Sequence, residues 1–187
     1  MILEVGIKII VLVLIILFFA LRFKFTLKYE LTKRSIGRSI LGVIWTIIYL
    51  FGFFDFARIN LDFFVRIFVG IPIILLSFIF IFLSHNSLKK NWSPITEEKF
   101  VRPKKIIKSG IYKRIRHAIY SSIFLMVIGF GILISNWLHW VIPFFSFLIL
   151  CLIKVPKEEE FLKKEFGDKY KEYLNETGRY FPKIKFS

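Results

Sequence analysis

The chain has 187 residues, of which 56% are hydrophobic and 24 are phenylalanine, and its mean hydropathy is +0.65. This exceeds the roughly 45–50% apolar content of a soluble domain, and the apolar residues form long blocks, so an ordinary water-soluble globule is excluded. The formal net charge of +15 argues little for nucleic-acid binding, because Lys and Arg lie between or after the apolar blocks rather than along one soluble face. The sequence predicts a single integral membrane domain over residues 1–187.

Five apolar blocks are candidate transmembrane helices, each near the 20 or so residues that a bilayer requires. In chain order they cover residues 2–23, 39–56, 63–84, 119–135 and 137–153. Basic residues follow the first block instead of preceding it, so we expect it to be retained rather than cleaved as a signal peptide. Asn136 and its neighbours are all that separates the last two blocks, which predicts a tight helical hairpin. The expected fold is an all-α, polytopic bundle with five transmembrane helices.

The basic residues predict an orientation for these segments. They are concentrated after the first block, in the stretch 85–118 and from residue 154 onward, whereas the turn at Asn136 has none. By the positive-inside rule these three basic regions are cytoplasmic. An outside N-terminus, five crossings and a cytoplasmic C-terminus satisfy this pattern, with only Arg58 and Arg66 against it.

The polarity of the chain changes abruptly after residue 153. Pro156 suits the first turn of a helix, and the glutamates at 158–160 suit its positive N-terminal end. Apolar residues then recur at helical spacing from Phe161 to Leu174. We therefore expect a C-terminal cytoplasmic amphipathic helix that ends near Gly178.

Four short motifs in the last hundred residues could carry chemistry: Asn91-Trp92-Ser93, residues 110–120, residues 156–160 and residues 178–182. Each has a structural explanation on its own. Arg116 and His117 suit headgroup anchoring, and carboxylates in a first helical turn stabilise it by about 0.3–1 kcal/mol each without any ligand. Neither a catalytic triad, a Walker loop, a dinucleotide fingerprint nor a metal-ligand pattern occurs at convincing spacing.

Taken together, the motifs GIYKRIRHAIYSS, VPKEEEFLKKEFGDKYKEY and TGRYFP resemble the C-terminal half of the isoprenylcysteine carboxyl methyltransferase family, most closely its prokaryotic and archaeal members. The wider superfamily also includes phospholipid N-methyltransferases. The resemblance covers about residues 91–182. It implies S-adenosylmethionine as cofactor and a lipophilic methyl acceptor, either prenylcysteine-like or a lipid, within a membrane. Residues 85–187 would then form the cofactor-binding half, after three transmembrane helices within residues 1–84.

The resemblance also implies roles for individual residues. Arg179 is expected near the carboxylate of the acceptor, and Arg179 and Glu159 are the candidate catalytic residues. Ala118 stands where the family has a proline that would rigidify the helix entrance. The candidate cofactor-binding residues are Tyr112, Arg116, His117, Tyr120, Ser121, Glu158, Glu159 and Glu160.

Several acceptors and one different class of protein remain open. A carboxylate, with an ordinary pKa near 3.5, attacks without a general base, whereas an amine must first lose a proton. The alternatives are therefore phospholipid N-methylation, methylation of a small thiol, and a non-catalytic lipid-binding or scaffold protein.

Overall fold

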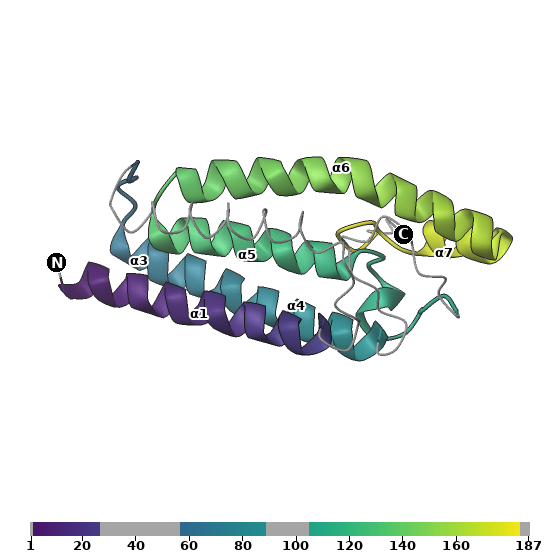
Figure 1. Cartoon of the computed structure of the whole chain (residues 1–187), viewed down its shortest axis with the longest axis horizontal. Helices are drawn as coiled ribbons and strands as arrows, with labels where there is room; N and C mark the ends of the chain where they lie inside the picture. The colour runs from purple at the N-terminus through teal and green to yellow at the C-terminus, as the bar shows by residue number, and fades with distance from the viewer. Residues whose placement is uncertain (1, 27–56, 89–104, 184–187) are drawn as a thin grey trace, which may run out of the picture. The chain divides into compact units, whose positions relative to one another are not determined.

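The computed structural model describes residues 2–26, 57–88 and 105–183, and this part of the chain is all-helical (Figure 1). The elements are α1 (Ile2–Thr26), α3 (Phe63–Val65), a π-helical turn (Arg66–Gly70), α4 (Ile71–Leu88), a 3-10 helix (Gly110–Lys113), α5 (Ala118–Ile134), α6 (Leu138–Phe166) and α7 (Asp168–Glu176). The described residues form no strand, only two isolated bridges, Arg58 with Asn136 and Ile115 with Gly178. The predicted all-α class is confirmed.

Within the described part of the chain, two continuous helical segments are long and apolar enough to cross a membrane. They are Phe63–Leu88, with 26 residues, and Leu138–Phe166, with 29 residues. Helix α5 is also apolar but has 17 residues. The predicted segment 39–56 and the motif at 91–93 lie outside the described residues. Five crossings, the tight hairpin and the orientation stay predictions.

The helix Phe63–Leu88 begins at a side-chain cap. Asp62 Oδ1 accepts hydrogen bonds from the backbone N–H groups of Phe64 (2.8 Å) and Val65 (3.3 Å). These are donors that a helix start leaves without an intrahelical partner, so the cap fixes where the apolar segment begins.

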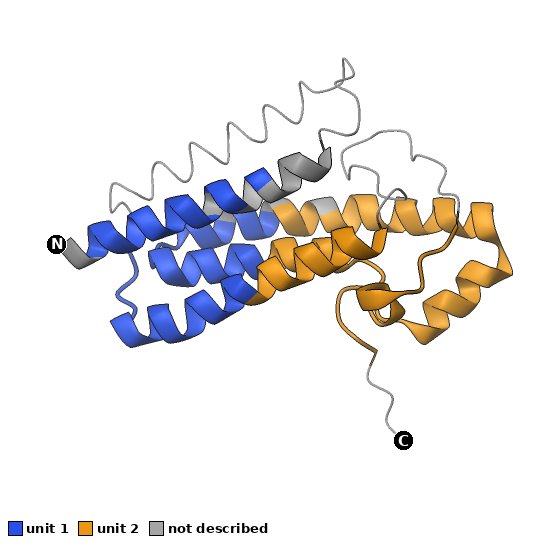
Figure 2. Ribbon diagram, turned by 90° about the horizontal axis from the view of Figure 1, so that it is seen from below, with its two compact units in different colours: residues 1–75, 125–146 blue, residues 76–124, 147–187 orange. Residues whose placement is uncertain are grey.

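The chain divides into two compact units (Figure 2). Unit 1 comprises Met1–Leu75 and Leu125–Ser146, and unit 2 comprises Leu76–Phe124 and Phe147–Ser187. Helices α4, α5 and α6 each contribute residues to both units. We describe the two units separately.

In unit 1, small residues allow close helix packing. A Cβ atom added to Gly129 would lie 2.6 Å from Ile74 Cγ1, and one added to Gly131 would lie 1.3 Å from Trp140 Cδ1. Helix α5 therefore approaches both neighbours at positions that only glycine permits, which is typical of helix contacts in membranes.

Unit 1 also contains an ion-paired group that we call the Glu4 cluster: Glu4, Arg58 and Arg66. The Arg66 guanidinium, 3% exposed, donates to Glu4 Oε1 at 2.6 Å and to Glu4 Oε2 at 3.1 Å. It also donates from Nε (3.0 Å) and Nη2 (2.9 Å) to the carbonyl of Leu133 in the last turn of α5. Arg58 adds a further bond of 2.8 Å to Glu4. Arg58 and Arg66, the two exceptions to the positive-inside pattern, thus form ion pairs with a residue of the chain itself.

The expected helix start at Pro156 is wrong. Helix α6 runs through this residue and ends at Phe166, where Gly167 turns the chain with φ 56° and ψ −130°. The residues after Pro156 are mostly strong helix formers, and Glu160 pairs with Lys164 at 2.7 Å, so the loss of one backbone donor does not end the helix. The glutamates therefore lie inside a long helix, and stabilisation of a first turn does not explain them. The amphipathic helix that follows is α7.

Candidate active site

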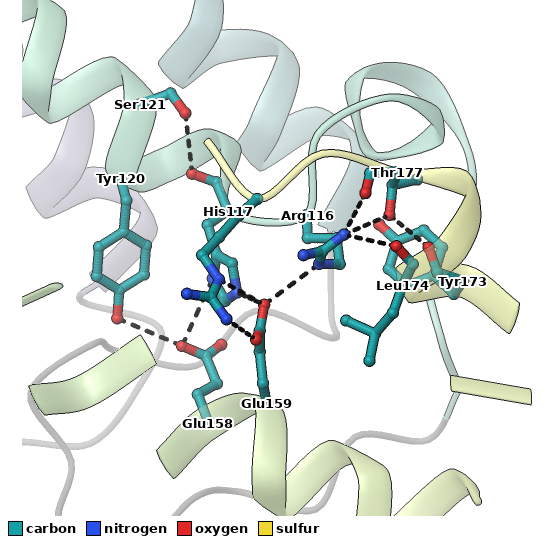
Figure 3. Close-up of polar contacts among 10 residues, drawn as sticks. Arg116, His117, Tyr120, Ser121, Glu158, Glu159, Tyr173, Leu174 and Thr177 are labelled. Carbon is teal, nitrogen blue, oxygen red and sulfur yellow. Dashed lines mark hydrogen bonds and ion pairs between the residues drawn. The ribbon is translucent and has the colours of Figure 1, made fainter. Parts of the chain in front are cut away.

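In unit 2, the start of α5 faces the polar end of α6 through a histidine and two glutamates (Figure 3). His117 Nε2 lies 3.2 Å from Glu159 Oε1, and its Nδ1 lies 3.9 Å from Glu158 Oε2. An ionised carboxylate only accepts hydrogen bonds, so Nε2 carries the proton in the contact with Glu159. The buried imidazole is therefore oriented by Glu159 and presents its other nitrogen toward Glu158.

Arg116 connects the same glutamate to the end of α7. Its Nε donates to Glu159 Oε1 at 3.2 Å. Its Nη1 donates to the carbonyl of Leu174 at 3.1 Å, to the hydroxyl of Thr177 at 3.2 Å and to the carbonyl of Thr177. The last carbonyls of a helix lack intrahelical donors, so this arginine completes the end of α7 while it pairs with α6.

Residues 177–180, which we call the C-terminal segment, run alongside the entry to α5. The backbone N–H of Gly178 donates to Arg114 (3.0 Å), and the carbonyl of Gly178 accepts from Arg116 N–H (2.9 Å). The carbonyl of Arg179 accepts from His117 N–H at 2.9 Å. A Cβ atom at Gly178 would lie 1.7 Å from the carbonyl oxygen of Phe181, so this path requires glycine. Backbone hydrogen bonds thus fix the position from which Arg179 extends.

The Arg179 side chain returns to Glu159. Its Nη2 lies 2.6 Å from Glu159 Oε2, and its Nε lies 3.2 Å from Oε1. The hydrogen bond to Glu159 raises the pKa of the Arg179 guanidinium above its ordinary value, although partial burial opposes this shift. The Arg179 side chain is 46% exposed and that of Glu159 is 5% exposed. Hydrogen bonds from His117 and Arg179 favour the ionised form of the Glu159 carboxylate.

Aromatic side chains form the other side of the site. The Tyr120 hydroxyl donates to Glu158 Oε2 at 3.3 Å. The rings of Tyr120 and Tyr180 lie 5.5 Å and 6.1 Å from the His117 ring, measured between centroids. Tyr120 and Phe147 belong to one buried core, against which Tyr180 packs. A carboxylate, a phenol and an imidazole therefore lie beside an apolar aromatic wall.

Most of the residues singled out in the sequence meet here. Ser121 joins the site indirectly, because its hydroxyl donates to the carbonyl of Tyr180 at 2.5 Å. Ala118, fully buried, is the first residue of α5, so the helix begins there without the proline of the resembled family. The residues brought together around Glu159 are Arg116, His117, Tyr120, Glu158 and Arg179.

Two of the predicted cofactor-binding residues lie outside this group. Tyr112 packs in a separate core with Ile115 and Ala118, and its carbonyl accepts from Tyr173 Oη at 2.7 Å. Burial raises the pKa of the Tyr112 and Tyr173 phenols, so both stay neutral. Glu160 is exposed and pairs with Lys164.

Thr177 and Tyr180 are site residues for which the sequence suggested no individual role. Both lie in or beside the motif TGRYFP, which was the available signal. Thr177 acts largely through its backbone carbonyl, and Tyr180 through its carbonyl and ring. Such backbone roles are independent of residue type, so a residue pattern does not reveal them.

Comparison with known proteins places these features in a family. The sequence model of the phospholipid methyltransferase family matches residues 65–169, more than half of the chain. A search of curated proteins gives no significant match.

Among solved structures, the chain is similar to the eukaryotic intramembrane Ras methyltransferase isoprenylcysteine carboxyl methyltransferase, solved without a monobody. The TM-score is 0.63 with 18% sequence identity, and the match covers 82% of this chain and 55% of that chain. The chain thus spans about half the length of this protein, and the similarity is one of fold. The family match includes His117, Tyr120 and both site glutamates. The chain belongs to the phospholipid methyltransferase family.

Proposed function

We propose that this chain is an S-adenosylmethionine-dependent membrane methyltransferase that O-methylates the carboxylate of an isoprenylcysteine-type or other lipophilic acceptor. The observation that carries the proposal is the meeting of three separate motifs at Glu159, which bonds to Arg116 and His117 of one motif and to Arg179 of another. The family match and the name of the similar solved structure support the same class of reaction.

The residues present fit the proposed cofactor. Glu158 is 33% exposed and bonded to Tyr120, so this pair suits the amino and hydroxyl groups of a nucleoside-linked amino acid. The rings of Tyr120 and Tyr180 suit a sulfonium cation, because an aromatic face attracts positive charge. When bound, S-adenosylmethionine supplies an activated methyl group. The residues of the chain then have to bind, align and exclude water.

Arg179 is the group that suits an acceptor carboxylate. A guanidinium has five N–H donors, and the described contacts of Arg179 with Glu159 use two of them. Its side chain is 46% exposed, so it can pair with a second carboxylate while it keeps the first. A carboxylate is ionised at neutral pH and needs no general base. Orientation by Arg179 would therefore suffice on the acceptor side.

A lipophilic acceptor is consistent with the position of the glutamates on α6. Leu152 and Ile153 are 66% and 54% exposed. They precede Glu158 by six and five residues on the same helix, a rise of about 8–9 Å. An exposed apolar surface thus ends within two helical turns of the site, where a lipid tail and a polar head can be bound together.

The family match favours a second acceptor, the amine of a phospholipid. This amine must lose a proton before it attacks. His117 Nδ1, 3.9 Å from Glu158, is the candidate base. A small thiol and a non-catalytic role are the remaining alternatives.

The test is a methyl-transfer assay on the purified chain in lipid nanodiscs with labelled S-adenosylmethionine. The acceptors are a farnesylcysteine analogue, phosphatidylethanolamine and a small thiol, and cofactor binding is measured separately by calorimetry. We expect the farnesylcysteine analogue to be methylated as a carboxyl ester. Label in the amine lipid or the thiol would identify an alternative acceptor. A folded chain that does not bind the cofactor would contradict the proposal and favour a scaffold.

A further inference from the structure

The adjacent glutamates 158 and 159 occupy opposite environments. The Glu159 side chain is 5% exposed, whereas that of Glu158 is 33% exposed. Both come from the same turn of α6 and point toward the start of α5 (Figure 3). Although they are adjacent in sequence, the two glutamates can therefore have different roles.

Glu159 has little acceptor capacity left for a ligand. A carboxylate offers about four lone-pair positions. Oε1 accepts from Arg116 Nε, His117 Nε2 and Arg179 Nε, each at 3.2 Å. Oε2 accepts from Arg179 Nη2 at 2.6 Å. These contacts saturate Oε1 and leave a single acceptor position, on Oε2, of a carboxylate that is only 5% exposed.

Glu158 is the opposite case. Its hydrogen bond to the Tyr120 hydroxyl is long, at 3.3 Å, and His117 Nδ1 is 3.9 Å away. One of its two oxygens, Oε2, makes both of these contacts. The partly exposed carboxylate thus retains acceptor positions for amino or hydroxyl groups of a ligand.

The partners of Glu159 all lead to the C-terminal segment. Arg179 belongs to this segment, and Arg116 bonds to the carbonyl and hydroxyl of Thr177 at its start. His117 is the third partner, and its backbone N–H donates to the Arg179 carbonyl of this segment. Loss of the Glu159 charge would leave two guanidiniums without their common anion, so the segment would separate more readily from α6.

We propose that Glu159 is a positioning residue that fastens the C-terminal segment and Arg179 to α6, and that Glu158, with Tyr120, is the carboxylate that contacts the cofactor. The assignment of Glu158 rests on the proposed function. The assignment of Glu159 concerns contacts within the chain, and it is testable without any cofactor.

The first experiment compares Glu159→Gln with its matched neighbour Glu158→Gln in cofactor-free protein. Amide hydrogen exchange is followed at Arg116 and His117, whose N–H groups donate to the C-terminal segment. We expect exchange to accelerate about tenfold or more in Glu159→Gln, because local opening becomes easier, and less than about threefold in Glu158→Gln. Equal exchange in both variants overturns the positioning role.

The second experiment separates positioning from a general structural effect. Glu159→Gln should raise the KM for the acceptor about tenfold or more through misplacement of Arg179, and the same substitution in an Arg179→Ala background should add less than about threefold. Glu158→Gln should instead weaken cofactor binding by about tenfold or more in calorimetry, with little change in acceptor KM. Additive effects of the Glu159 and Arg179 substitutions, or a larger loss of cofactor affinity in Glu159→Gln, overturn the division of roles.

If Glu159→Gln does not fold, Glu159→Asp serves in its place. It keeps the charge and shortens the side chain, so we expect cofactor affinity to stay at the wild-type value and amide exchange at Arg116 and His117 to be moderately faster than in the wild type. In the comparison of Glu159→Asp with Glu158→Gln, accelerated exchange in Glu158→Gln alone would overturn the proposal. A wild-type chain that binds no S-adenosylmethionine would refute the proposed function and the role of Glu158 together, whereas the exchange experiment would still decide the role of Glu159.

Discussion

Two carboxylates in this chain each accept hydrogen bonds from two arginines, one in each compact unit. In the Glu4 cluster the central arginine is buried, with Arg66 at 3% exposed, and the carboxylate is 29% exposed. Around Glu159 the carboxylate itself is buried, at 5% exposed. Each carboxylate has one mostly buried arginine, Arg66 or Arg116, and one that is nearly half exposed, Arg58 at 42% or Arg179 at 46%. The two arrangements therefore differ in the exposure of the carboxylate and not in that of the arginines.

The partners of the two carboxylates differ in chemistry as well. Arg66 also donates two hydrogen bonds to the Leu133 carbonyl, in the last turn of α5. Glu159 instead orients His117, beside the Glu158 and Tyr120 pair. A buried ion pair alone therefore does not identify a functional site in a membrane protein. The distinguishing signs here are a second carboxylate, Glu158, bonded to Tyr120, and aromatic neighbours that suit a ligand.

The largest expected effect tests the structural side of this comparison. Arg66→Met removes the cation but leaves Glu4 and the Leu133 carbonyl, so we expect a loss of about 3–5 kcal/mol in the free energy of unfolding. Equilibrium unfolding in mixed micelles measures it. The double variant Glu4→Gln/Arg66→Met should recover part of the loss. Cofactor affinity of the folded fraction should stay within about twofold, and a large fall in that affinity would make the Glu4 cluster part of the site.

The next effect concerns the exposed cation of the site. Arg179→Ala should lower kcat/KM for the farnesylcysteine analogue about a hundredfold, because an oriented charge-assisted contact is lost. The melting temperature should change by less than about 2 °C, since a half-exposed ion pair contributes little to stability. The control is Arg114→Ala, because the Arg114 side chain is exposed and only its backbone bonds to the C-terminal segment among the described contacts. This variant should retain activity. Full activity in Arg179→Ala would remove this residue from the acceptor site.

A smaller effect tests the turn between α6 and α7. Gly167 has φ 56° and ψ −130°, and a Cβ atom there would contact nothing within 4 Å. Gly167→Ala should therefore cost about 1–3 kcal/mol in unfolding free energy through the backbone alone. Gly6→Ala, in α1 near Glu4 and also without a steric neighbour, should be neutral or stabilising. Equal destabilisation by the two substitutions would show that the turn at Gly167 is not strained.

The smallest expected effect separates Glu160 from the other glutamates. Glu160 is exposed and paired only with Lys164 among its described contacts, so Glu160→Gln should leave thermal stability unchanged. Cofactor affinity in calorimetry should stay within about twofold. A loss comparable to that of Glu158→Gln would return Glu160 to the cofactor site, as the sequence motif first indicated.

Local patterns predicted the helical class and most of the site. Long apolar runs dictate helices in a bilayer because backbone groups must bond within the segment, and α4, α5 and the first part of α6 follow this rule. Arg116, His117, Glu158 and Glu159 lie in two motifs whose order and spacing carried the resemblance. These features depend on residue type and spacing, which a sequence displays directly.

The remaining features depend on competition or on backbone contacts. Pro156 indicated a helix start, but the helix formers around it outweigh one missing donor, and α6 instead ends at Phe166, before Gly167. Arg58 and Arg66 looked like exceptions to a charge rule because their partner, Glu4, is more than fifty residues away. The role of Thr177 depends on its backbone carbonyl, which every residue type possesses.

The C-terminal segment has a consequence for how the protein is made. Synthesis proceeds from the N-terminus, so every described apolar helix is complete before residues 177–180 are added. In the nascent chain, the start of α5 therefore forms before the C-terminal segment that bonds to it, and Glu159 is made before Arg179. Membrane insertion and completion of the site are separate events, and a chain that stops before Gly178 would be an inserted helix bundle whose glutamate lacks one of its two arginines.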